Sequence, residues 1–171
     1  MSSSHIWSLF HALIVVFTSF LCYTLESYYI YSISISFVYI LLDLIIHTSE
    51  IDKATGVHHF LFLAFTSYAI FIDNSFASII YKYIGIFEVS TIFLNLYHMY
   101  KKEIYGLLFV ASFFISRIVI GAYITFSDAY YFISQHTIMS YINSILGIAL
   151  YILQVYWFWK IVMKLKRRMS K

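Results

Sequence analysis

The segment ATGVHHFLFLAFTSYAIFIDN, residues 54–74, decides the fold, because two adjacent histidines are followed there by an almost unbroken apolar run. Across all 171 residues, 62% of the side chains are hydrophobic, only 11% are charged, and proline is absent. Soluble proteins average about 45–50% apolar and about 25% charged residues. A water-soluble fold of this length would therefore lack the polar surface to cover its core, so lipid is the expected solvent for most of the chain.

Apolar runs of nearly the length needed to cross a membrane, about 20 residues per helix, recur along the chain. Only helices and closed barrels satisfy every backbone polar group in lipid. The period-two pattern YSISISFVY, residues 31–39, occurs once, whereas a barrel needs such segments throughout. The sequence thus predicts an all-α polytopic membrane bundle, a single domain over residues 1–171 with a polar-lined, lipid-accessible interior. The six expected spans are residues 6–24, 28–46, 58–73, 78–100, 105–126 and 138–160.

The distribution of charge predicts the orientation of these spans. Lysine and arginine concentrate in KIVMKLKRRMSK, residues 160–171, and in YKKE, residues 100–103, whereas the expected loops near Asp73 and Asp128 carry acids. Basic segments stay on the cytosolic side of membranes, so both termini are expected there. Topology and contact with an anionic leaflet account for the net charge of +3, and no nucleic-acid partner is expected.

Nearly every expected span carries polar side chains on one face, since residues three, four or seven apart lie on the same side of a helix. Exposing such edges to lipid is costly, so they are expected to surround a polar or wet interior. The alternative, that serines and threonines only pack neighbouring helices, stays open. The longest edges comprise Ser32, Ser36, Tyr39, Asp43 and His47; Tyr81, Glu88, Thr91, Asn95 and His98; and Asn143, Gly147, Tyr151 and Gln154.

Depth along the helices brings particular ionisable residues to one level. At the rise of an α-helix, Glu88 lies ~15 Å below the outer end of its span and Arg117 ~18 Å above the inner end of the next, antiparallel one. The two are expected to meet in mid-membrane, as a structural ion pair or as part of a ligand site. A second level, in the cytosolic third, contains His11, Asp43, His47, His58, His59 and His98.

The histidine level suggests acid–base rather than metal chemistry. Adjacent helical residues diverge by about 100°, so His58 and His59 are poorly placed to share a metal ion, and no metal site is expected. A neutral imidazole can act as a general base or accept an acyl group, and Asp43 can orient it. The catalytic candidates are therefore His58, His59 and Asp43, and the ligand-binding candidates are Glu88, Thr91, Asn95, His98 and Arg117.

Six segments, taken in order, resemble the TLC domain family and cover nearly the whole chain. The resemblance rests on the His58-His59 pair, Asp43, Glu88 with Ser90 and Thr91, Asn95, Arg117 and Trp157. The segments are SLFHALIVV, SFVYILLDLIIH, GVHHFLFLAFTSY, FEVSTIFLNLYHM, FVASFFISRIVIG and LQVYWFWKIVMK.

The TLC family includes ceramide synthases, which N-acylate sphingoid bases with acyl-CoA, and members tied to membrane lipid composition or trafficking. His58 and His59 match the synthase histidine pair. The synthases also carry a histidine-aspartate step and a further aspartate, but the corresponding region here reads YIGIFEVSTIFLN, residues 83–95, with Glu88 alone. The chain therefore resembles the non-synthase members.

Three functions remain open at this point. The leading one, implied by the resemblance, is a protein of the endoplasmic reticulum or a connected membrane that binds, senses or remodels lipids, with membrane lipids as partners and no cofactor. The second is a lipid acyltransferase with acyl-CoA as co-substrate and the histidine pair as its reactive groups. A transporter or channel is the third, although the chain lacks the inverted repeats and proline-broken helices that transporters commonly use.

Overall fold

The computed structural model describes residues 3–25, 29–46, 53–72, 74–134 and 136–169, and every regular element in these ranges is helical. This confirms the predicted all-α class. Because α5, η2 and α6 follow one another without a break, the elements form six continuous helical rods, matching the six expected spans in order. The elements are α1 Ser3–Thr24, α2 Tyr29–Ile46, α3 Lys53–Phe71, α4 Asn74–Tyr100, α5 Glu103–Phe113, η2 Phe114–Ile120, α6 Gly121–Ser134 and α7 Ile138–Met169.

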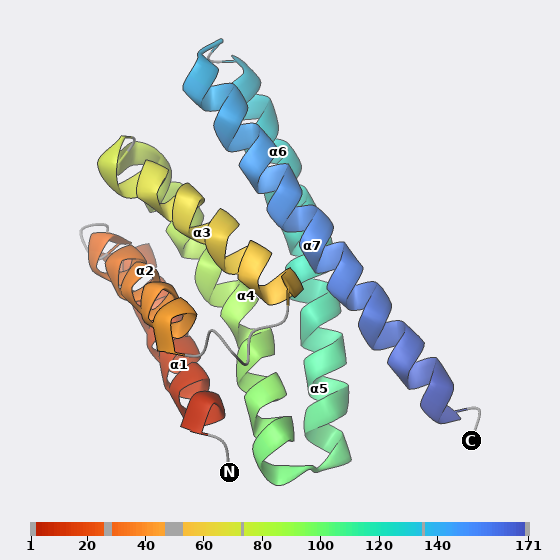
Figure 1. Cartoon of the computed structure of the whole chain (residues 1–171). Helices are drawn as coiled ribbons and strands as arrows, with labels where there is room; N and C mark the ends of the chain where they lie inside the picture. Colours follow the sequence, from red (N-terminus) through yellow and green to blue (C-terminus); the bar gives the residue numbers. More distant parts are fainter. Residues whose placement is uncertain (1–2, 26–28, 47–52, 73, 135, 170–171) are drawn as a thin grey trace.

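Four of the rods are long and apolar enough to cross a membrane, and α3 and α4 lie between them (Figure 1). α4 packs against α1 and α5, while α3 packs against α2 and α7. The two central helices carry the histidine pair, Glu88 and Asn95, and these polar residues lower their hydropathy. Part of the polar chemistry therefore comes from the two helices that lie between the more apolar ones. The four segments long and apolar enough to cross a membrane are His5–Cys22, Tyr29–Ile46, Glu103–Tyr131 and Ile138–Arg167.

The first and last helices have their terminal ends on the same side of the bundle, together with the turn that joins α4 to α5 (Figure 1). That turn contains Lys101 and Lys102. The expectation of an acidic loop near Asp128 was wrong, because α6 continues to Ser134 and Asp128 lies within it. Asp73 and His47 lie outside the described residues.

α1 and α4 approach each other closely at Gly85. A Cβ atom on Gly85 would lie 2.5 Å from Cβ of Ser19 and 3.4 Å from Cα of Val16. Small residues at such crossings let membrane helices come into backbone contact, which replaces the hydrophobic effect as a source of helix association in lipid. The buried cluster of Val15, Cys22, Ile33 and Ile84 lies beside this crossing and joins α1, α2 and α4.

The long rod formed by α5, η2 and α6 changes packing partner half-way along. α5 packs against α4, α6 packs against α7, and η2 contacts both α4 and α7. Within η2 the hydrogen bonding is of the π type: the N–H of Gly121 donates to the carbonyl of Ser116, five residues earlier. As a result α5 and α7 diverge toward the end that carries both termini, while α6 and α7 run together at the opposite end (Figure 1).

Candidate functional site

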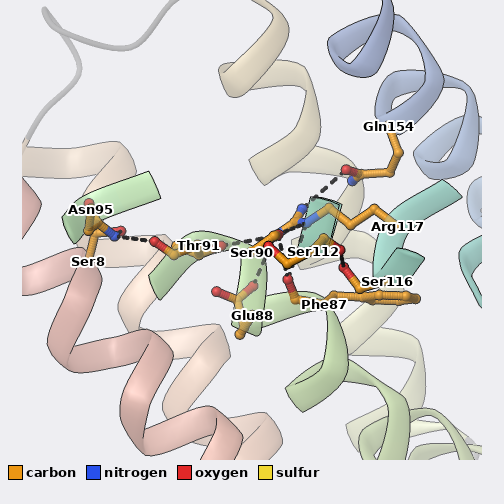
Figure 2. Close-up of polar contacts among 10 residues, drawn as sticks. All are labelled: Ser8, Phe87, Glu88, Ser90, Thr91, Asn95, Ser112, Ser116, Arg117 and Gln154. Carbon is orange, nitrogen blue, oxygen red and sulfur yellow. Dashed lines mark hydrogen bonds and ion pairs between the residues drawn. The ribbon is translucent and has the colours of Figure 1, made fainter. Parts of the chain in front are cut away.

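Arg117 projects from η2 against α4 and is the most highly connected side chain of the interior (Figure 2). Its Nε donates to Oγ of Ser90 at 2.8 Å and to the carbonyl of Phe87 at 3.3 Å. Its Nη2 donates to Oγ1 of Thr91 at 2.9 Å and lies 3.5 Å from Oε1 of Glu88. All four partners belong to the FEVST segment of α4, residues 87–91, so one turn of that helix forms a socket for the guanidinium group.

The meeting of Glu88 and Arg117 predicted from helix depth is confirmed. Their side chains are 19% and 11% exposed, so both charges are largely removed from solvent. A third helix completes the arrangement, because Nη1 of Arg117 donates to Oε1 of Gln154 on α7 at 3.1 Å. Gln154 belonged to a predicted polar edge but not to the predicted site, and its spacing from Tyr151 was the available signal. We call Glu88, Arg117 and Gln154 the central polar layer.

Asn95 connects this layer to the first helix. Its Nδ2 donates to Oγ of Ser8 on α1 and to the carbonyl of Thr91, both at 3.0 Å (Figure 2). Asn95 is 3% exposed and does not line a cavity. The structure therefore places it behind Thr91, where it ties α1 to α4.

His59 and Asp43 lie opposite each other across the α2–α3 interface. Nδ1 of His59 is 3.6 Å from Oδ2 of Asp43, longer than a hydrogen bond but within ion-pair distance for a protonated imidazole. His59 is 9% exposed. The carboxylate is thus close enough to orient the histidine or stabilise its charge.

His58 faces away from Asp43, as the angle between adjacent helical residues predicts. Its ring lies edge-on to Trp157 of α7, with centroids 5.1 Å apart, and 5.9 Å from the ring of His59. Its Nδ1 is buried, and no hydrogen-bond partner for it lies in the part of the chain that the structure describes. A buried ring nitrogen without a partner costs free energy, so this atom is available to a ligand.

The other two described histidines of this level, His11 and His98, are held by ring stacking. His11 stacks on Tyr39 at 3.8 Å between centroids, and His98 stacks on His5 at 4.6 Å. Nε2 of His11 is also buried without a hydrogen bond. These histidines therefore do not form one cluster, but they border the same space.

That space is a cavity of about 820 Å³, which we call the larger cavity. Its volume falls in the range of about 300–1,000 Å³ typical of ligand pockets. Three exposed lysines, Lys101, Lys160 and Lys164, line its end nearest the termini. Six of the eight predicted site residues line it: His58, His59, Glu88, Thr91, His98 and Arg117. Asp43 and Asn95 stand behind His59 and Thr91.

A second space, the smaller cavity, has a volume of about 120 Å³ and lies toward the α6–α7 end of the bundle. His58, Glu88 and Arg117 line both cavities, so the central polar layer separates the two. Beyond this layer the smaller cavity has mainly apolar walls, and its polar residues include Thr125, Asp128, Asn143 and Ser144.

The fold and the site together define a class of protein: a helical membrane bundle that buries a charged layer between two cavities. The chain belongs to the TLC domain family, whose model matches residues 2–163. This confirms the resemblance recognised in the sequence and identifies an integral membrane protein of a family with lipid-related functions. Searches of curated proteins and of solved structures found no match.

Proposed function

We propose that this protein binds a membrane lipid within its bundle and thereby influences the lipid composition of the endoplasmic reticulum or a connected membrane. The larger cavity is the observation that supports this role. It combines hydrogen-bonding groups, contributed by Thr91, His58 and Arg117, with apolar walls from Leu94 and Val110. Ligand sites typically pair a few polar groups that fix orientation with apolar surface that supplies affinity.

The lysines give this lipid a preferred orientation. Lys101, Lys160 and Lys164 line the end of the larger cavity at which both termini lie. Basic residues favour the cytosolic side and attract anionic headgroups. We place this end, with both termini, in the cytosol, and the acyl chain toward the central polar layer.

Filling the larger cavity should displace its lipid. Val110 of α5 lines this cavity, whereas Val119 of η2 is 52% exposed on the outer surface. We expect Val110→Trp to reduce the lipid retained per protein by at least half and Val119→Trp to leave it unchanged. The measurement is lipid mass spectrometry of protein purified in mild detergent. Equal retention by wild type and both variants would contradict a lipid-filled interior.

A second candidate function is acyl transfer from acyl-CoA, favoured by the His59–Asp43 pair and by the unpartnered Nδ1 of His58. A histidine acting as general base would take the proton of an acceptor amine or hydroxyl. The acceptor's electron pair would attack the thioester carbonyl, and the coenzyme A thiolate would leave and take up that proton. Glu88 and Arg117 would position the acceptor's head group, and no other cofactor is required.

Removing the histidine pair separates the two functions. If the protein transfers acyl groups, cells with wild-type protein should accumulate an acylated lipid that cells with His58→Ala, His59→Ala protein lack by tenfold or more. His136→Asn is the matched control, because His136 is exposed at a turn with φ of 51°, a conformation that asparagine tolerates. Identical lipid profiles for wild type and double variant, at equal protein levels, would exclude histidine chemistry and leave lipid binding.

A further inference from the structure

The smaller cavity contains a buried amide that packing does not explain. Asn143 of α7 is 1% exposed, and neither its Nδ2 nor its Oδ1 has a hydrogen-bond partner among the described residues. Leaving a buried polar group unsatisfied costs about 1–3 kcal/mol. The neighbouring Ser144 lines the same cavity, but its Oγ donates to the carbonyl of Ser140 at 3.0 Å. Both halves of this amide are therefore available to a ligand.

A carboxylate on the facing helix adds a second polar group. Asp128 of α6 lines the same cavity, as does Thr125. Among the described residues that line this cavity, Arg117 is the only lysine or arginine, and its guanidinium group is already engaged by the central polar layer. An acidic side chain at membrane depth requires a donor, so a ligand bound here must be able to donate a hydrogen bond to Asp128.

The inventory of donors and acceptors selects the ligand chemistry. Oδ1 of Asn143 and the Asp128 carboxylate require donors, while Nδ2 of Asn143 requires an acceptor. An ammonium group only donates, so it would leave Nδ2 unsatisfied. A carboxylate or phosphate would meet Asp128 with like charge. Hydroxyl groups both donate and accept, so a group that carries several of them can serve both side chains.

The walls and the volume indicate what carries these hydroxyl groups. Phe65, Ile84 and Leu150 contribute apolar surface, so an amphiphile fits better than a free sugar or glycerol. At about 120 Å³ the cavity accepts one end of such a molecule rather than the whole. We infer that Asn143 and Asp128 form a second subsite, across the central polar layer from the lysines, that binds the neutral polyol headgroup of an amphiphile.

This inference rests on the proposed lipid-binding role of the interior, and its test uses the purified protein in lipid nanodiscs. The probe is tritiated 1-O-dodecylglycerol, with unlabelled dodecylamine, dodecanoic acid and free glycerol as competitors. We expect Asn143→Leu to weaken probe binding tenfold or more. Ser127→Ala, next to Asp128 but exposed, should leave it unchanged. Asp128→Asn keeps a hydrogen-bonding group and should reduce binding by only a few fold.

Competition by the unlabelled compounds shows which headgroup binds and whether it must be attached to an alkyl chain. Dodecylglycerol should compete at least tenfold better than dodecylamine or dodecanoic acid, and free glycerol should compete weakly. Competition by free glycerol at equal concentration would support the polyol but overturn the amphiphile. Stronger competition by dodecylamine, or wild-type binding by folded Asn143→Leu protein, would overturn the subsite. The Val110→Trp experiment separates this inference from the proposed function. If Asn143→Leu leaves probe binding unchanged while Val110→Trp still removes the retained lipid, only the second subsite is wrong and the proposed function stands.

Discussion

Replacing Arg117 with methionine is expected to lower the free energy of unfolding by about 3–5 kcal/mol, the range for breaking one side of a buried ion pair. Methionine has a similar length but no donors, so the Glu88 carboxylate would remain in the interior without its cation. Ser90, Thr91 and Gln154 would each lose the hydrogen bond that they accept from the guanidinium group. The cost is large because lipid around the bundle offers no water to replace these partners.

A double-mutant cycle tests this interpretation. Unfolding by sodium dodecyl sulfate in mild detergent should give Arg117→Met the lowest stability. Glu88→Gln added to Arg117→Met should recover most of the loss, since the uncompensated charge is then gone. Exposed ion pairs typically contribute up to about 1 kcal/mol. If Arg117→Met lowered the free energy of unfolding by less than this, the two charges would not be buried together.

Introducing a single methyl group at Gly85 is expected to cost about 1–3 kcal/mol, the usual penalty for overpacking. The new Cβ would overlap Cβ of Ser19, and the nearby Cα of Val16 is backbone that a rotamer change cannot move. The α1–α4 crossing must therefore widen, and the Asn95–Ser8 hydrogen bond between the same helices would lengthen with it.

Two further variants give this prediction its controls. Ser19→Gly in the Gly85→Ala background removes the overlapping atoms and should restore part of the thermal stability. Gly147→Ala makes the same chemical change at a position where a new Cβ would meet nothing within 4 Å, so it should be neutral or slightly stabilising. Equal melting temperatures for Gly85→Ala and Gly147→Ala in detergent would contradict the close crossing.

The features that sequence predicted best depend on fixed helix geometry. The rise per residue placed Glu88 and Arg117 at one depth, and the angle per residue separated His58 from His59, so both relations could be anticipated. The polar edges also indicated an interior, since Ser32, Ser36 and Asn143 are all buried.

What sequence did not predict depends on how the rods pack. No glycine or proline between residues 126 and 134 signals a helix end, so the expected end of the span at residue 126, with a loop near Asp128, lacked support from the local sequence. The inclusion of Gln154 in the central polar layer follows from the crossing of η2 and α7, which periodicity within one helix cannot reveal. From the sequence, Lys160 and Lys164 were linked to topology and leaflet contact and not to the interior, although their spacing of four residues places them on one face of α7.

The π-type turn of η2 also acts as a one-residue allowance in the long rod. A turn closed by i→i+5 bonds holds one residue more than an α-helical turn, so loss of a single residue between Phe114 and Ile120 would restore a regular helix. Because that residue is the one by which the wider turn exceeds an α-helical turn, α6 would keep its direction relative to α5, whereas the same loss from a regular helix turns everything beyond it by about 100°. Asp128 would stay on the wall of the smaller cavity. The wide turn therefore lets the chain vary in length by one residue here without changing the angular phase between the two cavities.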